Sequence, residues 1–214
     1  MGRMNETTST PLARVHGGAM IAAPALLAAS SIAYAAAGGL GNDQVGGTIQ
    51  LYAMAAFPLA LLGLTRILAP LRPRAAAILS VMAVIGSAGG VAYAVDAIHT
   101  AVHPEGPLDQ FPVGPLILNA PGLTFPLTLM GIGIALARSG VAPSWSGYAL
   151  AVSGLLFPLS RIPSIAPLAT VADLVMLAAL APVGWSMLRS QTTNEEFARP
   201  VARMPQSGAV AAAR

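Results

Sequence analysis

Long apolar runs separated by short polar segments dominate this sequence. A helix needs roughly 20 apolar residues to cross the hydrocarbon core of a bilayer, at a rise of about 1.5 Å per residue. Six runs approach or exceed that length, at about residues 17–37, 48–68, 75–95, 113–137, 145–159 and 165–188. The pattern therefore predicts an all-α fold, a polytopic integral membrane bundle of six transmembrane helices.

The connecting segments contain the residues that end helices. They are rich in glycine, proline or charged residues at about residues 38–47, 66–74 and 103–112. The last of these contains three prolines before the next run begins and is too proline-rich to continue a helix. Within the fourth run, Pro115, Pro121 and Pro126 should kink or break the helix.

The arginines predict the orientation of this bundle. Ten of the eleven fall in the N-terminal segment, the second and fourth connections, and the C-terminal tail, whereas Arg161 alone lies on the other side. Because positively charged segments stay in the cytoplasm, both termini are expected there, and the protein is expected in the cytoplasmic (inner) membrane. The chain then divides into a cytoplasmic segment (1–15), the transmembrane domain (16–189) and a cytoplasmic tail expected to be disordered (190–214).

The first apolar run has a second interpretation. Arg3 and Arg14 precede it, and Ala33-Tyr34-Ala35 has the small-x-small form of a secretory cleavage site. The run is, however, longer than the roughly 7 to 15 apolar residues of a signal peptide. We interpret it as a retained first span, with cleavage as the alternative.

Composition agrees with a lipid environment and excludes several kinds of chemistry. Hydrophobic residues make up 55% of the chain and charged residues 9%, against roughly 25% charged in soluble domains. There is no lysine, so a retinal Schiff base is impossible, and no cysteine, so disulfides and thiolate metal sites are absent. The arginines lack interleaved aromatic residues, so nucleic acid is not expected as a partner. The lipid bilayer is the expected partner. The sequence does not indicate an oligomeric state.

The third run is expected to form the central helix. Asp96, His99, Thr100 and His103 follow it at i, i+3, i+4 and i+7, so they share one stripe of a helix. Small residues form another stripe, which lets neighbouring backbones approach closely in lipid. Its members are Ala83, Gly86, Ser87, Gly90, Ala94 and Ala97.

The two histidines of this stripe suggest a metal site. His99 and His103 are four residues apart and can share a Zn²⁺ ion, with Asp96 one turn earlier as a third ligand. A solvated helix end and a proton relay are the alternatives. A haem with two axial histidines is disfavoured, because both rings lie on one helix face and cannot bracket one iron.

Two charged residues are expected at matching depth in the last two spans. Asp173 lies 16 residues before Arg189, and Arg161 lies 16 residues after Trp145. An antiparallel hairpin would bring Arg161 and Asp173 together. Because a charge at the centre of a span costs about 2.5 to 3.5 kcal/mol, we predict a salt bridge between them. It either fixes the hairpin or serves as an anion or proton site.

Other rare polar residues fall at the same outer level, namely Gln50, Tyr93 and Asn119. With Asp96, His99, Arg161 and Asp173 they predict an outward-opening pocket, unless each only forms a hydrogen bond between helices. The leading hypothesis is a non-enzymatic ligand-binding or transport-type protein with a small-molecule or lipidic ligand. The alternatives are a scaffold or accessory subunit of a membrane complex, and a membrane enzyme acting on a lipid or isoprenoid.

The sequence contains one internal repeat and one region of resemblance to other proteins. Phe57-Pro58-Leu59 and Phe125-Pro126-Leu127 form a weak internal repeat, explained by a duplicated two-helix unit or by chance. Residues 138–185 resemble uncharacterised bacterial multi-pass membrane proteins of the domain-of-unknown-function kind. This resemblance implies several packed spans and assigns no functional residue. It rests on Arg138-Ser139-Gly140-Val141-Ala142-Pro143-Ser144-Trp145-Ser146-Gly147, Leu155-Leu156-Phe157-Pro158 and Gly184-Trp185.

Overall fold

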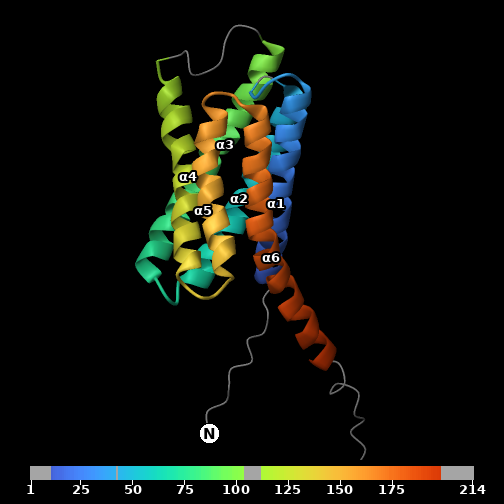
Figure 1. Ribbon diagram of the computed structural model, residues 1–214, viewed down its shortest axis with the longest axis vertical. Coiled ribbons are helices and arrows are strands. Elements are labelled where there is room, and N and C mark those ends of the chain that lie inside the picture. Colours follow the sequence, from blue (N-terminus) through green and yellow to red (C-terminus); the bar gives the residue numbers. More distant parts are fainter. Residues whose placement is uncertain (1–10, 42, 104–111, 199–214) are drawn as a thin grey trace, which may run out of the picture.

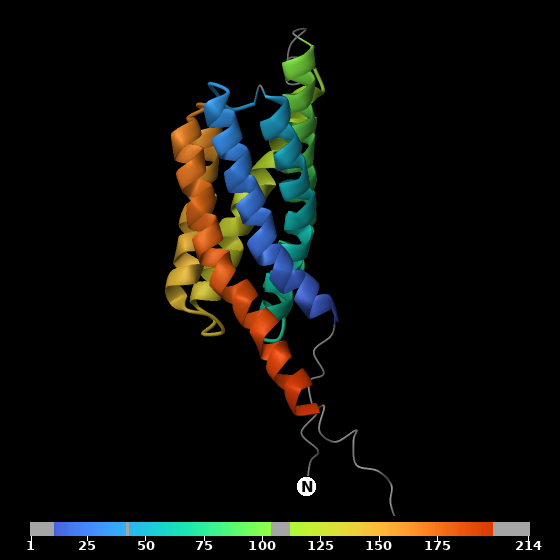
Figure 2. The same ribbon diagram turned by 90° about the vertical axis from the view of Figure 1, so that its right-hand side faces the viewer.

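The computed structural model describes residues 11–41, 43–103 and 112–198, and within these ranges the fold is all-α. Neighbouring helices along the chain pack side by side in opposite directions, and the last helix packs against the first (Figures 1 and 2). The helices therefore form a closed ring. They are α1 (Pro11–Ala36), α2 (Gln44–Leu68), α3 (Pro73–Val102), α4 (Gly114–Ala137), α5 (Ser144–Arg161) and α6 (Ala166–Ala198).

Five of these six helices are long and apolar enough to cross a membrane. The prediction of six spans is thus supported for all but α5. This helix has only 18 residues, and four of them are serines, which lower its hydropathy. It nevertheless packs between α4 and α6 as a full member of the ring.

Three predicted features of the helices need correction. Helix α1 begins at Pro11, ahead of the apolar run, and α6 continues to Ala198, well past Leu188. Helix α4 is unbroken, although Pro121 and Pro126 lie inside it, so the predicted break is absent and the alternative of a kink stays a prediction. Apolar length is thus a poor guide to helix ends, because polar residues such as glutamate and glutamine also favour helix. In α4, the hydroxyl of Thr124 donates a hydrogen bond to the backbone carbonyl of Pro121 at 2.5 Å. The proline-containing part of the helix thus has a hydrogen bond from a side chain to its own backbone.

Helix α3 is not central, contrary to the prediction. Its main neighbours are α2 and α4, like any member of the ring, and its outward face exposes large apolar side chains such as Val81 and Val84. The small-residue stripe does permit close packing, as predicted. A Cβ atom on Gly86 would lie 2.5 Å from the backbone nitrogen of Phe125, and one on Gly90 would lie 2.4 Å from the sulfur of Met54.

Three phenylalanines meet in the middle of the ring. The ring of Phe125 lies 5.0 Å from that of Phe57 in an edge-on arrangement and 5.1 Å from that of Phe157. Each phenylalanine begins a Phe-Pro-Leu triplet, on α4, α2 and α5 respectively. The predicted repeat includes the first two triplets, and Phe157-Pro158-Leu159 is a third copy of the same sequence signal. The triplets thus place an aromatic layer across the core.

Candidate functional site

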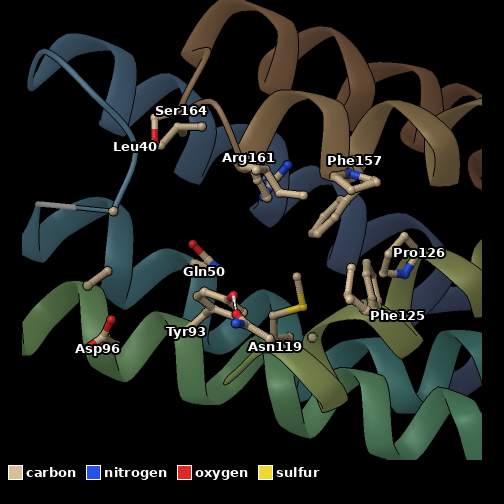
Figure 3. A pocket seen from close by; sticks show the side chains of 18 of the residues that line it. Leu40, Gln50, Tyr93, Asp96, Asn119, Phe125, Pro126, Phe157, Arg161 and Ser164 are labelled. Atoms are coloured by element: carbon tan, nitrogen blue, oxygen red, sulfur yellow. Dashed lines mark hydrogen bonds between the residues drawn. The ribbon is translucent and has the colours of Figure 1, made fainter. Parts of the chain in front are cut away.

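A cavity of about 630 Å³ opens on one side of this aromatic layer. It lies toward the end of the bundle that holds the α1–α2 and α5–α6 turns, which we call the cavity end (Figure 1). Leu40 and Ser164 from these two turns line its mouth, and Phe125 and Phe157 line its inner part (Figure 3). The opposite end, with the α2–α3 and α4–α5 turns, is called the arginine end.

The short α5 accounts for the position of the cavity. This helix ends at Arg161, and Figure 1 shows α3 and α4 extending beyond it at the cavity end. The α5–α6 turn therefore lies below the ends of α3 and α4 at that end of the bundle. Arg161 and Phe157 therefore face the cavity from one side, and Gln50, Tyr93 and Asn119 face it from the other (Figure 3).

The salt bridge predicted between α5 and α6 is confirmed. The Nη2 atom of Arg161 lies 3.1 Å from Oδ2 and 3.4 Å from Oδ1 of Asp173. The hydroxyl of Ser31, on α1, donates to Oδ2 of Asp173 at 2.5 Å. Asp173 is completely buried, whereas the Arg161 side chain is 18% exposed. This cluster joins three helices, and the arginine is its part that reaches the cavity.

The cation of Arg161 is held in a fixed orientation. Its guanidinium carbon lies 3.9 Å from the centroid of the Phe157 ring, a cation–π contact. Phe157 in turn contacts Phe125, so the charge rests on the aromatic layer. Phe157 packs on one face of the guanidinium, and Asp173 accepts a hydrogen bond from Nη2. The Nη1 amino group remains for another partner.

Two polar groups of the cavity lining are buried without a hydrogen-bond partner. They are the Nη1 atom of Arg161 and the hydroxyl of Tyr34, on α1. Tyr34 is 2% exposed, its ring packs against Gly46, and its hydroxyl is within electrostatic range of the Arg161 cation. An unsatisfied buried donor costs about 1 to 3 kcal/mol. Two such groups in the lining of one cavity suggest an interaction with something that enters the cavity.

The structure brings five of the seven candidate ligand-binding residues to this cavity: Gln50, Tyr93, Asp96, Asn119 and Arg161. Asp173 lies behind Arg161 and does not line the cavity, and neither does His99. The hydroxyl of Tyr93 donates to Oδ1 of Asn119 at 2.8 Å. This bond joins α3 to α4, as the alternative interpretation of these residues expected.

The structure shows how the two histidines of the stripe are arranged. The rings of His99 and His103 are stacked, with centroids 5.0 Å apart and planes at 22°. Over the ranges that the structure describes, no three histidine, aspartate or glutamate side chains are grouped so that they can hold a metal ion. Asp96 lines the cavity, whereas His99 and His103 are not among the residues that line it.

Sequence reasoning missed Tyr34 and Ser31 as members of the site. Both lie in α1, at the cavity end of the first apolar run, far in sequence from Arg161 and Asp173. Tyr34 had a detectable signal, because it shares an Ala-Tyr-Ala context with Tyr93. Ser31 had none, since serine is common in apolar helices, and only ring closure between α1 and α6 places it beside Asp173.

The site combines an apolar interior with a small set of hydrogen-bonding groups. Comparisons with protein-family models, with curated proteins and with solved structures give no match. The chemistry of the cavity is therefore the basis for any functional statement. Its volume is within the usual range for small-molecule sites, roughly 300 to 1,000 Å³, which are mostly apolar with a few placed polar groups.

Proposed function

We propose that this protein is an integral protein of the cytoplasmic membrane in which all six helices cross the bilayer, with both termini in the cytoplasm. Support comes from the described arginines. Arg66, Arg72, Arg74 and Arg138 lie in or beside the two turns of the arginine end, and only Arg161 lies near the cavity end. Under the positive-inside rule, the cavity then opens toward the outside.

Cysteine labelling tests this orientation, because the chain has no cysteine of its own. We expect Gly39→Cys, in the α1–α2 turn, to react with a membrane-impermeant maleimide. The cells used have an intact cytoplasmic membrane, and the layers outside it are permeable to the reagent. Val141→Cys, in the α4–α5 turn, should react only after the membrane is opened. Val141 is exposed and Gly39 is half-buried, and nothing lies within 4 Å of a Cβ atom at Gly39. The reverse labelling pattern would disprove the orientation.

We also propose that the protein binds a small amphiphilic ligand in the cavity, without catalysis. The observation that carries this proposal is the pair of unpartnered donors, Tyr34 and Arg161, above an apolar interior that includes Met54, Phe125 and Phe157. An acceptor oxygen on a ligand would satisfy both donors. The ligand's apolar part would lie against the aromatic layer.

Tyr34→Phe tests ligand binding without disturbing packing. The hydroxyl it removes has no partner in the protein, so the free energy of unfolding should stay the same or rise slightly. Loss of one hydrogen bond to a ligand should weaken retention about tenfold, equivalent to roughly 1.4 kcal/mol. The measurement is mass spectrometry of small molecules that stay bound when the protein is purified from its own membrane in mild detergent.

The matched control is Tyr148→Phe, which removes a hydroxyl from a tyrosine of α5 that is 58% exposed and outside the cavity. It should retain the same molecules as the unchanged protein. A scaffold or accessory subunit predicts a different result. In that case no molecule is enriched over the bulk lipids, or Tyr34→Phe and Tyr148→Phe retain it equally, and the proposed function is wrong.

A further inference from the structure

Helices α4 and α5 touch closely near the arginine end. A Cβ atom on Gly147 would lie 2.4 Å from the backbone nitrogen of Ala137, and one on Gly133 would lie 2.6 Å from the backbone nitrogen of Ala151. Toward the middle, a Cβ atom on Gly154 would lie 2.8 Å from the Pro126 carbonyl oxygen. Backbones this close leave no passage between the two helices in this half of the bundle.

Beyond Pro126 the same two helices bound an opening. Leu123 of α4 and Ile162, directly after α5, both line the cavity and are 48% and 77% exposed. A side chain that lines a cavity and is strongly exposed marks a place where the cavity reaches the surface. We call this place, bounded by Leu123, Pro126, Pro158 and Ile162, the side opening.

The neighbouring side of the cavity is held closed. There the hydroxyl of Tyr93 on α3 donates to Asn119 on α4. Close packing of α3 on α4 continues below that bond, where a Cβ atom on Gly89 would lie 2.5 Å from the backbone nitrogen of Gly122. The opening between α4 and α5 is thus distinct from the α3–α4 contact.

The depth of the side opening places it within the hydrocarbon of a bilayer. Leu123 lies 15 residues before Arg138, the residue that directly follows α4 at the arginine end. At about 1.5 Å per residue this is roughly 22 Å, whereas the hydrocarbon core is about 30 Å thick. If the helices cross the membrane as proposed, the side opening faces acyl chains and not water.

The charges of the site favour an uncharged ligand. Among the described residues that line the cavity, Arg161 is the only cationic one, and its charge is balanced by the buried carboxylate of Asp173. Asp96 adds a second carboxylate at the lining. An anionic head group would lose its hydration on entering the site, and no surplus positive charge there would compensate for that loss. An uncharged carbonyl or hydroxyl group can accept from Tyr34 and Arg161 without that cost.

We propose that the ligand is an uncharged single-chain amphiphile that enters sideways from the outer leaflet through the side opening. This inference rests on the proposed ligand-binding function. The head group accepts hydrogen bonds from Tyr34 and from Nη1 of Arg161. The chain lies over the aromatic layer and leaves between Leu123 and Ile162.

Photolabelling in phosphatidylcholine nanodiscs tests the class of ligand. Three probes share one diazirine-bearing C18 chain and differ in the head group: an alcohol, a carboxylic acid and an amine. We expect the alcohol to label cavity residues most strongly, with competition by unlabelled oleyl alcohol and about tenfold weaker labelling in Tyr34→Phe. Stronger labelling by the acid or the amine would overturn the uncharged class while leaving a ligand-binding cavity in place.

Bulky substitutions test the route of entry. Leu123→Trp and Ile162→Trp should each slow the rate of alcohol labelling about tenfold, because the indole ring obstructs the side opening. The controls are Leu127→Trp and Leu159→Trp, at positions on the same helices that are 54% and 53% exposed but do not line the cavity. They should label at the original rate.

These outcomes separate failure of the route from failure of the function. Equal rates in all four tryptophan variants, with Tyr34→Phe still weakening the labelling, would overturn sideways entry alone. If no probe labels the cavity above the level of the lipid-facing controls, and Tyr34→Phe changes nothing, the proposed function fails together with the inference. Circular dichroism of each variant establishes that the helices are formed before labelling.

Discussion

Arg161→Met destabilises the folded protein by about 3 to 5 kcal/mol, because it leaves the completely buried carboxylate of Asp173 without its cationic partner. Asp173→Asn should cost less, since the Arg161 side chain is 18% exposed and its charge can reach water in the cavity. The double variant should be more stable than Arg161→Met by a few kcal/mol, because neither charge remains. The measurement is the free energy of unfolding by denaturant titration in micelles, followed by circular dichroism.

Arg66→Met serves as the matched control, because Arg66 is an exposed arginine in the last turn of α2. It should change the free energy of unfolding by no more than about 0.5 kcal/mol. If the effects of Arg161→Met and Asp173→Asn simply add in the double variant, the two residues are not coupled and the salt bridge does not stabilise the fold. A double variant that is stable but retains no ligand would show that the pair is needed for binding.

Gly147→Val should destabilise the protein by about 3 kcal/mol or more through overpacking. Already the first added carbon would lie 2.4 Å from the nitrogen of Ala137 and 2.6 Å from the carbonyl oxygen of Gly133. Both are backbone atoms of α4, so no side-chain rotation relieves the clash. Helices α4 and α5 must then move apart, which should appear as a lower unfolding midpoint and faster proteolysis in the α4–α5 turn.

Gly18→Val is the control for this substitution. Gly18 lies inside α1, and nothing is within 4 Å of a Cβ atom placed there. The same change of residue in a helix should therefore alter the unfolding midpoint little. Equal destabilisation by Gly18→Val would mean that the effect at Gly147 reflects helix propensity, and that close contact between α4 and α5 contributes nothing.

The wrong prediction of a central α3 has a physical cause. In a water-soluble helix, polar residues mark the outside, but here both the core and the outward face are apolar. Val81, Val84 and Ile85 on α3 are 44% or more exposed, although they are as hydrophobic as the buried Leu79. The sequence of α3 therefore indicated a helix with a close-packing stripe and could not show that its other side faces outward.

Local and one-dimensional features could be read from the sequence alone. They include the all-α class, the approximate helix positions, the arginine asymmetry, and the matching depth of Arg161 and Asp173, all of which follow from a fixed rise per residue and the cost of burying charge. Only the tertiary structure decided which distant residues meet. Closure of the ring places Ser31 beside Asp173 and Tyr34 near Arg161, and the short α5 leaves the cavity open. These contacts depend on the rotational orientation of each helix about its own axis. The pattern of hydrophobic residues does not encode that orientation when both sides of a helix are apolar.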